Sequence, residues 1–254
     1  MSILGRKSNM ATKKEHKIVS ADDGKPTTAA PQKPKVKEAK EVGNPTPLRI
    51  GAVLLWVLAL AFEVLAILVF MGKVNLKFLP MLWQMILFLV LDFIAVVIGA
   101  QLWKKANHID PASEKNKVKF WLWNNMGVIA AAFCFFPFII LLLTNKDVDK
   151  KTKAIGTAAA VVLLLISGLA GYDWNPVSEE QKAQAVEVLG DTQVYWAPFG
   201  KVYHTHEDCS SLNQSETLTV GTVEQAIAAN RTRLCSFCAK RDAISGVETD
   251  GTGE

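Results

Sequence analysis

Long apolar runs alternate with short polar segments through the middle of the chain. The runs cover residues 50–72, 78–103, 120–143 and 154–172 and contain almost no charged side chains. A helix rises about 1.5 Å per residue, so each run is long enough to cross the roughly 30 Å hydrocarbon core of a bilayer. A helix also satisfies its backbone hydrogen bonds internally, as lipid requires. The pattern therefore predicts a transmembrane region of four helices over residues 49–173.

The chain before the first run has a different composition. Residues 1–48 are rich in Lys, Ala, Pro and Thr and contain few large apolar side chains. Such a segment buries too little apolar surface to offset the entropy lost on ordering, so we expect a disordered basic tail. The first 49 residues carry eleven Lys and Arg against five Asp and Glu, which also favours loose attraction to anionic lipid.

The chain after the fourth run becomes polar and is typical of a small globular domain. We expect a linker or short helix at 174–191, a domain at 192–245 and a disordered tail at 246–254. Apolar and polar residues alternate on both sides of Pro198-Phe199-Gly200, which predicts a β-hairpin with a glycine-containing turn. The predicted fold is thus mostly α, with four transmembrane helices and a small α+β C-terminal domain.

A short helix is expected to follow the hairpin in this domain. Thr222 precedes it and Gln225 follows three residues later, which is the pattern of a capping box. Asn230 is a plausible residue for its end. The domain therefore combines a hairpin and one short helix within about 50 residues, which leaves little room for an apolar core.

The distribution of Lys and Arg predicts the orientation of the membrane region. The basic tail and five lysines between residues 104 and 119 favour a cytoplasmic N-terminus, whereas the lysines at 146–153 locally oppose it. The first helix and its flank usually dominate, so the N-terminus is expected in the cytoplasm. Four crossings return the C-terminus to the same side. The expected location is the cell membrane, as a multi-pass protein.

Two acidic residues fall inside the apolar runs. Glu63 lies near the middle of the first run and Asp92 near the middle of the second, at similar depths in an antiparallel helix pair. An ionised side chain there is costly, so each acid is expected to be protonated, paired or next to a polar cavity. One interpretation is a proton or cation path through a small transporter or channel. The other is a hydrogen bond between helices, worth about 1 kcal/mol.

A group of cysteines and histidines follows the membrane region. Cys235 and Cys238 form a C-x-x-C pair, Cys209 adds a third thiol, and His204 or His206 completes a set of four. One imidazole and three thiolates are a common tetrahedral ligand set for structural Zn²⁺, whereas Ca²⁺ and Mg²⁺ prefer oxygen. A disulfide or a thioredoxin-type redox pair is the alternative. A disulfide needs an oxidising compartment, and a thioredoxin-type redox pair needs a βαβ unit around it.

Basic residues surround the C-x-x-C pair. Arg231, Arg233, Lys240 and Arg241 are expected to offset the single negative charge of Zn²⁺ bound by three thiolates and a neutral imidazole. Together with the basic tail they make nucleic-acid binding a weaker candidate function, because the patch is small and mixed with acids.

Residues 192–241 also resemble a known module. The segments "VYWAPFGKVYHTHEDCSSL" and "GTVEQAIAANRTRLCSFC" are similar to a metal-binding module at the ends of many uncharacterised bacterial proteins, itself similar to the N-terminal zinc domain of the DNA-repair protein Ada. The resemblance implies that His204, Cys209, Cys235 and Cys238 bind the metal and that His206 is spare. The membrane part resembles bacterial multi-pass proteins of unknown function.

The first ligand position departs from that family. In Ada it is a thiolate that accepts a methyl group, and here it is His204, whose metal-bound imidazole has no comparable anionic lone pair. The helix-turn-helix companion of Ada is also missing. The resemblance therefore implies a fold and a metal but not alkyl transfer.

These features together predict a non-enzymatic membrane protein. No H-E-x-x-H motif, phosphate-binding glycine loop or recognisable Ser-His-Asp arrangement is present in the sequence, and four protein ligands would leave no open position on the zinc. We expect the zinc module to bind a cytoplasmic protein partner, with the lipid bilayer as the other partner. The alternative is a transporter with Glu63 and Asp92 in its pathway and the zinc module as sensor or gate. The sequence indicates no particular oligomeric state.

Overall fold

The computed structural model describes residues 16–27, 42–146 and 148–251. The chain forms two compact units, which we call the sheet unit and the four-helix unit. The sheet unit comprises Met1–Lys40, Ala185–Ala226 and Arg233–Glu254, and the four-helix unit comprises Glu41–Gln184 and Ile227–Thr232.

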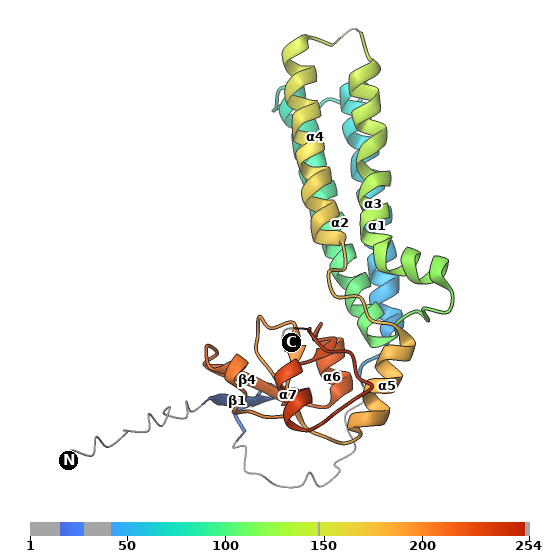
Figure 1. Ribbon diagram of the computed structural model, residues 1–254. Helices are drawn as coiled ribbons and strands as arrows, with labels where there is room; N and C mark the ends of the chain where they lie inside the picture. Colours follow the sequence, from blue (N-terminus) through green and yellow to red (C-terminus); the bar gives the residue numbers. More distant parts are fainter. Residues whose placement is uncertain (1–15, 28–41, 147, 252–254) are drawn as a thin grey trace, which may run out of the picture. The chain divides into compact units, whose positions relative to one another are not determined.

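Four long helices lie side by side in the four-helix unit (Figure 1). They are α1 (Pro45–Phe70), α2 (Met81–Ile109), α3 (Lys117–Thr144) and α4 (Lys150–Gly171). Each is long and apolar enough to cross a membrane. The predicted four-helix region is therefore confirmed, with helix ends that differ from the predicted bounds by up to six residues.

Polar caps explain where three of these helices begin. Asn44, Asn116 and Asp149 each accept a hydrogen bond from a backbone N–H two or three residues further on, at 2.9–3.0 Å. Such caps satisfy amide groups that have no partner within the helix. Because the caps lie upstream of the apolar runs, α1, α3 and α4 start three to five residues before hydrophobicity alone predicts.

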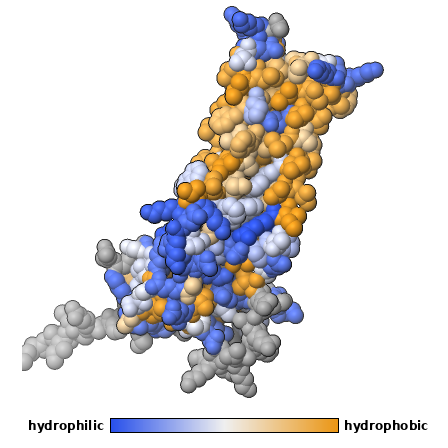
Figure 2. Space-filling view, turned by 90° about the vertical axis from the view of Figure 1, so that its right-hand side faces the viewer, coloured by the Kyte–Doolittle hydropathy of each residue, from blue (hydrophilic) through white to orange (hydrophobic). Residues whose placement is uncertain are grey.

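The interior of the four-helix unit is a continuous apolar core. Its largest fully buried side chains include Met85, Leu89, Phe135, Phe138 and Leu142. Large apolar side chains also point outward from all four helices, and Figure 2 shows them as a broad hydrophobic band. Helices that are apolar on their inner and outer faces are typical of a membrane environment.

Glycines bring the backbones of α3 and α4 into close contact. A Cβ atom placed on Gly171 would lie 2.8 Å from the carbonyl carbon of Gly127, which no side chain tolerates. A Cβ atom placed on Gly168, one turn earlier in α4, would have no other atom within 4 Å. Small residues at such crossings are a common way for membrane helices to pack.

A buried contact between His108 and Asp173 joins the end of α2 to the segment that follows α4. His108 Nε2 lies 2.9 Å from Asp173 Oδ2, and both side chains are buried. Asp173 Oδ1 also accepts a hydrogen bond from the backbone N–H of Asn175 at 3.1 Å. These contacts fix the polar segment after α4 against the end of α2.

The start of α5 (Glu179–Leu189) is held by the loop between α2 and α3. Glu180 accepts hydrogen bonds from the Ser113 hydroxyl and from the backbone N–H of Glu114. Lys182 donates to the carbonyl oxygen of Ile109 at 2.7 Å. The predicted short helix at 174–191 is confirmed.

The sheet unit contains two small sheets. The first has the strand order β1-β4-β2, with β1 (Lys17–Ser20) parallel and β2 (Val194–Trp196) antiparallel to β4 (Thr217–Gly221). The second pairs β3 (Val202–Tyr203) with β5 (Arg233–Leu234) in parallel. The helical segments after β3 are η1 (Ser210–Leu212), α6 (Val223–Ala228) and α7 (Ser236–Arg241).

The structure corrects the expected disorder at both ends of the chain. Lys17–Ser20 is a strand rather than a disordered tail, because its backbone pairs with β4 and the Ile18 side chain is buried. Residues 246–251 also pack against the unit, since Asp250 accepts a hydrogen bond from the Ser236 backbone N–H at 3.0 Å. Residues 45–48 of the predicted tail belong to α1. Residues 1–15, 28–41 and 252–254 of the two predicted tails lie outside the described residues.

The predicted hairpin and short helix are present in altered form. β2 and β3 are linked by two backbone hydrogen bonds between Tyr195 and His204, but their main partners are β4 and β5. The Thr222 and Gln225 capping box is confirmed, with reciprocal hydrogen bonds of 2.9 and 3.2 Å. Asn230, which adopts a positive φ of 66°, follows the end of α6.

Candidate metal centre

Four potential ligands come from the ends of short elements in the sheet unit. His204 follows β3, and its backbone is fixed by the two hydrogen bonds to Tyr195. Cys209 is the residue before η1, and Cys235 follows β5 as the N-cap of α7. Cys238 lies in the first turn of α7. A C-x-x-C pair split between a helix cap and its first turn presents both sulfurs on one side of the helix.

The four side chains converge on one point. Their ligand atoms all lie within 4.8 Å of one another, and all four residues are buried. The Sγ atoms of Cys209 and Cys235 are 3.9 Å apart, and Cys238 Sγ lies 3.8 Å from His204 Nδ1. This cluster could hold a metal ion, with Nδ1 as the imidazole ligand.

Burial and hydrogen bonding affect the three thiols of the cluster unequally. A hydrogen bond from Cys238 lowers the pKa of the Cys235 thiol to about 3, and the same interaction raises the pKa of Cys238. Burial raises the pKa of Cys209. The protons of Cys209 and Cys238 are thus bound more tightly than in a free cysteine. A metal ion would displace those protons, because metal-bound cysteines are thiolates.

His206 lies outside the cluster. Its Nε2 atom is 2.6 Å from Asp242 Oδ1, while the other oxygen of Asp242 accepts a hydrogen bond from Thr205. The structure thus separates the two histidines that the sequence left open, and it brings His204 to the three cysteines. The pairing of His206 with Asp242 had no signal in the sequence.

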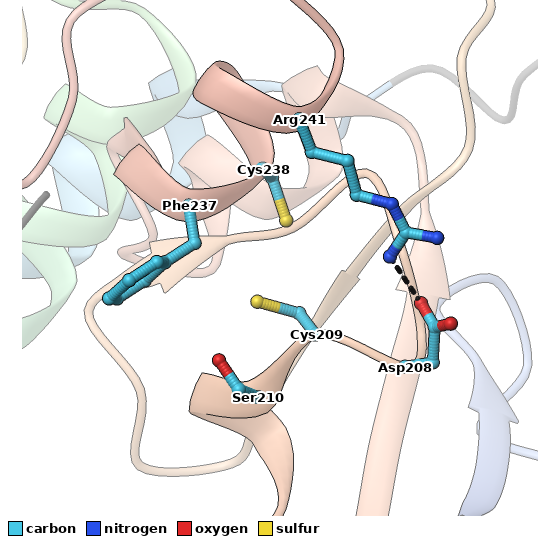
Figure 3. Close-up of a pocket in the computed structure, with 6 residues that line it drawn as sticks. All are labelled: Asp208, Cys209, Ser210, Phe237, Cys238 and Arg241. Atoms are coloured by element: carbon cyan, nitrogen blue, oxygen red, sulfur yellow. Dashed lines mark hydrogen bonds and ion pairs between the residues drawn. The ribbon is translucent and has the colours of Figure 1, made fainter.

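A pocket of about 130 Å³ opens beside two of the sulfurs (Figure 3). Cys209 and Cys238 extend into it from opposite sides, next to Phe237. Arg241 and Asp208 border it and form an ion pair of 2.8 Å. The pocket gives solvent a route to the cluster on this side.

Two of the four basic residues around the C-x-x-C pair form ion pairs with acids. Arg233 pairs with Glu248 at 3.5 Å and Arg241 pairs with Asp208. The charge of Arg241 also interacts with Cys238. Because two of the four expected cations have acidic partners, this region offers less free positive charge to a nucleic acid than its sequence suggests.

Comparisons of the sequence and the fold found no matching family model, curated protein or solved structure. The resemblance to the Ada-type module therefore stays a prediction.

Proposed function

We propose that this protein is a non-enzymatic multi-pass membrane protein whose sheet unit is held together by a structural Zn²⁺ and binds a protein partner in the cytoplasm. The observation that carries the proposal is the convergence of His204, Cys209, Cys235 and Cys238 within 4.8 Å in a buried setting.

The spacing of the ligand atoms supports zinc in particular. With Zn–S bonds of about 2.3 Å and a Zn–N bond of about 2.0 Å, a tetrahedral site has S–S edges of about 3.8 Å and S–N edges of about 3.5 Å. The S–S distance of 3.9 Å and the S–N distance of 3.8 Å are within a few tenths of an ångström of these values. Three thiolates and one imidazole also disfavour the hard cations Ca²⁺ and Mg²⁺.

The ligand set supports a structural role. Four protein ligands complete a tetrahedron, whereas a catalytic zinc keeps a position for water or substrate.

The sheet unit exposes Phe199 almost completely, at 98% of its surface, in the turn between β2 and β3. This side chain is the candidate contact for the proposed protein partner.

The pairing of β1 with β4 supports the placement of both ends of the chain on the same side of the membrane. β1 precedes α1 and β4 follows α4, yet the two strands pair in one sheet. The chain between them must therefore cross a bilayer an even number of times, which four spans satisfy. The basic N-terminal tail and the five lysines from 104 to 119, at the end of α2, in the loop after it and at the start of α3, favour the cytoplasm for this side.

The metal claim is tested on the full-length protein purified in detergent. We expect one equivalent of zinc per chain by elemental analysis, and a loss of at least tenfold in metal content in C235S and C238S. The matched control is C134S, because Cys134 is a buried cysteine of α3 outside the cluster and its substitution should leave the zinc content unchanged.

The two histidines provide a second matched pair. H204A should lose zinc, whereas H206A should keep it, since His206 contacts Asp242 rather than the cluster. Wild-type protein that folds without any bound metal would refute the structural role. Equal metal loss in H204A and H206A would refute the ligand set.

A further inference from the structure

Two carboxylic acids are enclosed in the interior of the four-helix unit. Glu63 comes from α1 and is 3% exposed, and Asp92 comes from α2 and is fully buried. They are close enough for their charges to interact, and both also interact with the Cys134 thiol of α3. The two acids that the sequence places at similar depths therefore share one site.

The two acids have unequal hydrogen bonding. Glu63 Oε1 accepts a hydrogen bond of 3.3 Å from the backbone N–H of Phe138, the residue after Pro137 in α3. Both carboxyl oxygens of Asp92 are buried and have no hydrogen-bond partner among the described residues. A buried carboxylate without a partner is costly, and a proton lowers that cost because it removes the charge.

Other charges in the unit do not compensate for the two acids. In the described part of the chain, no lysine, arginine or histidine forms an ion pair with Glu63 or Asp92. The charged residues of α3 and α4 are lysines in the first turn of each helix, at 117 and 119 and at 150, 151 and 153. Two adjacent carboxylates in an apolar interior cannot both be ionised, because each charge disfavours the other.

We propose that Glu63 and Asp92 form a proton-binding site, with the proton held on Asp92 beside an ionised Glu63. An N–H donor favours the charged form of the carboxyl it contacts, which assigns the charge to Glu63. Asp92 receives no donor and is the more buried of the two, which assigns it the proton. Two carboxylates supply at most four oxygens, and Ca²⁺ or Mg²⁺, which take about six or more, would have to carry additional water molecules into this apolar interior.

The proton is detected by infrared spectroscopy of the full-length protein in lipid nanodiscs. A protonated carboxyl group has a C=O stretching band separate from the bands of carboxylates, and this band shifts in D₂O. We expect such a band in the wild-type protein at neutral pH. It should be lost in D92N and retained in E63Q. Thermal unfolding of each variant checks that it is folded.

Three results would overturn the proposal. They are a wild-type spectrum without a protonated carboxyl band, a band that persists in D92N, and a thermal stability that rises with Na⁺ while the band is absent. The last result would indicate a bound monovalent cation.

If D92N does not fold, a pH titration of the wild-type protein and of E63Q replaces it. The wild-type band should disappear on alkalinisation, and it should disappear at a lower pH in E63Q because the neighbouring charge is gone. A band with the same titration in both proteins contradicts the pairing.

Discussion

The four-helix unit and the sheet unit are stabilised in different ways. The four-helix unit contains helices of 22 to 29 residues around a continuous apolar core, and its backbone hydrogen bonds are local. The sheet unit contains strands of two to five residues whose partners are distant in sequence. The most concentrated interaction in the sheet unit is the cluster of His204, Cys209, Cys235 and Cys238.

This difference shows where each unit is vulnerable. Side-chain packing in the four-helix unit is spread over many residues, so a single substitution removes only part of its stability. Under the proposed function the sheet unit depends on metal binding at this cluster, because strands this short do not fold in isolation. The predictions below begin with the change that should separate the two units most clearly.

Metal removal should have the largest effect, and only on the sheet unit. Structural zinc contributes about 10–16 kcal/mol of apparent binding free energy in small modules, so a chelator should unfold residues 194–241. Amide hydrogen exchange should then become fast in β2–α7 and stay slow in α1–α4. Equal loss of protection in both units would show that they are not stabilised independently.

Breaking the buried ion pair at the end of α2 should have the next largest effect. H108A leaves the Asp173 carboxylate buried without its main partner, which costs about 3–5 kcal/mol of unfolding free energy. R49A is the matched control, since Arg49 pairs with the exposed Asp110 and its loss should cost about 0–1 kcal/mol. Thermal unfolding in detergent measures both, and similar losses would contradict the role of burial.

The glycines of α4 test the packing of the four-helix unit at a smaller scale. G171A forces a methyl group against the backbone of Gly127 and should destabilise the unit by about 1–3 kcal/mol. G168A adds the same methyl group where no atom lies within 4 Å, so it should cause no loss. If the two variants unfold alike, α3 and α4 do not meet at these glycines.

The smallest effect is expected at the exposed contact that holds α5. Hydrogen bonds from Ser113 and the Glu114 N–H lower the pKa of Glu180 below its ordinary value of 4.5. A lowered pKa in the folded state means that this contact stabilises fully above pH 4.5 and loses its effect as the pH falls through the lowered pKa.

E180Q tests that contact. Its stability difference from the wild type should be constant at neutral pH and should vanish in acid. Hydrogen exchange of the Glu114 amide is the direct measurement, because that amide donates to Glu180. A stability difference that persists in acid would show that the ionised carboxyl group is not responsible.

The sequence predicts the four long helices well because their signal is local. Each apolar run predicts its own helix. The polar caps at Asn44, Asn116 and Asp149 moved the starts of α1, α3 and α4, whereas α2 continues six residues past its apolar run, to Ile109. The three cysteine ligands were also identifiable, since C-x-x-C spacing and a nearby third cysteine are visible in the chain.

What the sequence did not predict depends on distant pairing. The segment "KIVS" is too short and too polar in its surroundings to indicate a strand, and its register partner Thr217 lies far along the chain from Lys17. His204 and His206 are two residues apart and lie on the same side of an extended chain, so periodicity cannot distinguish them. The Asp242 side chain makes the distinction, through a contact that only the folded unit contains.

The pairing of β1 with β4 fixes an order of events during synthesis. β1 leaves the ribosome first, but its register partner Thr217 follows 200 residues after Lys17. At about 5–20 residues per second, the nascent strand waits roughly 10–40 s while the intervening helices are made. Sheet closure is thus one of the last steps of biogenesis. A nascent chain in which an odd number of helices crosses the membrane keeps Lys17–Ser20 on the opposite side of the membrane from Thr217–Gly221.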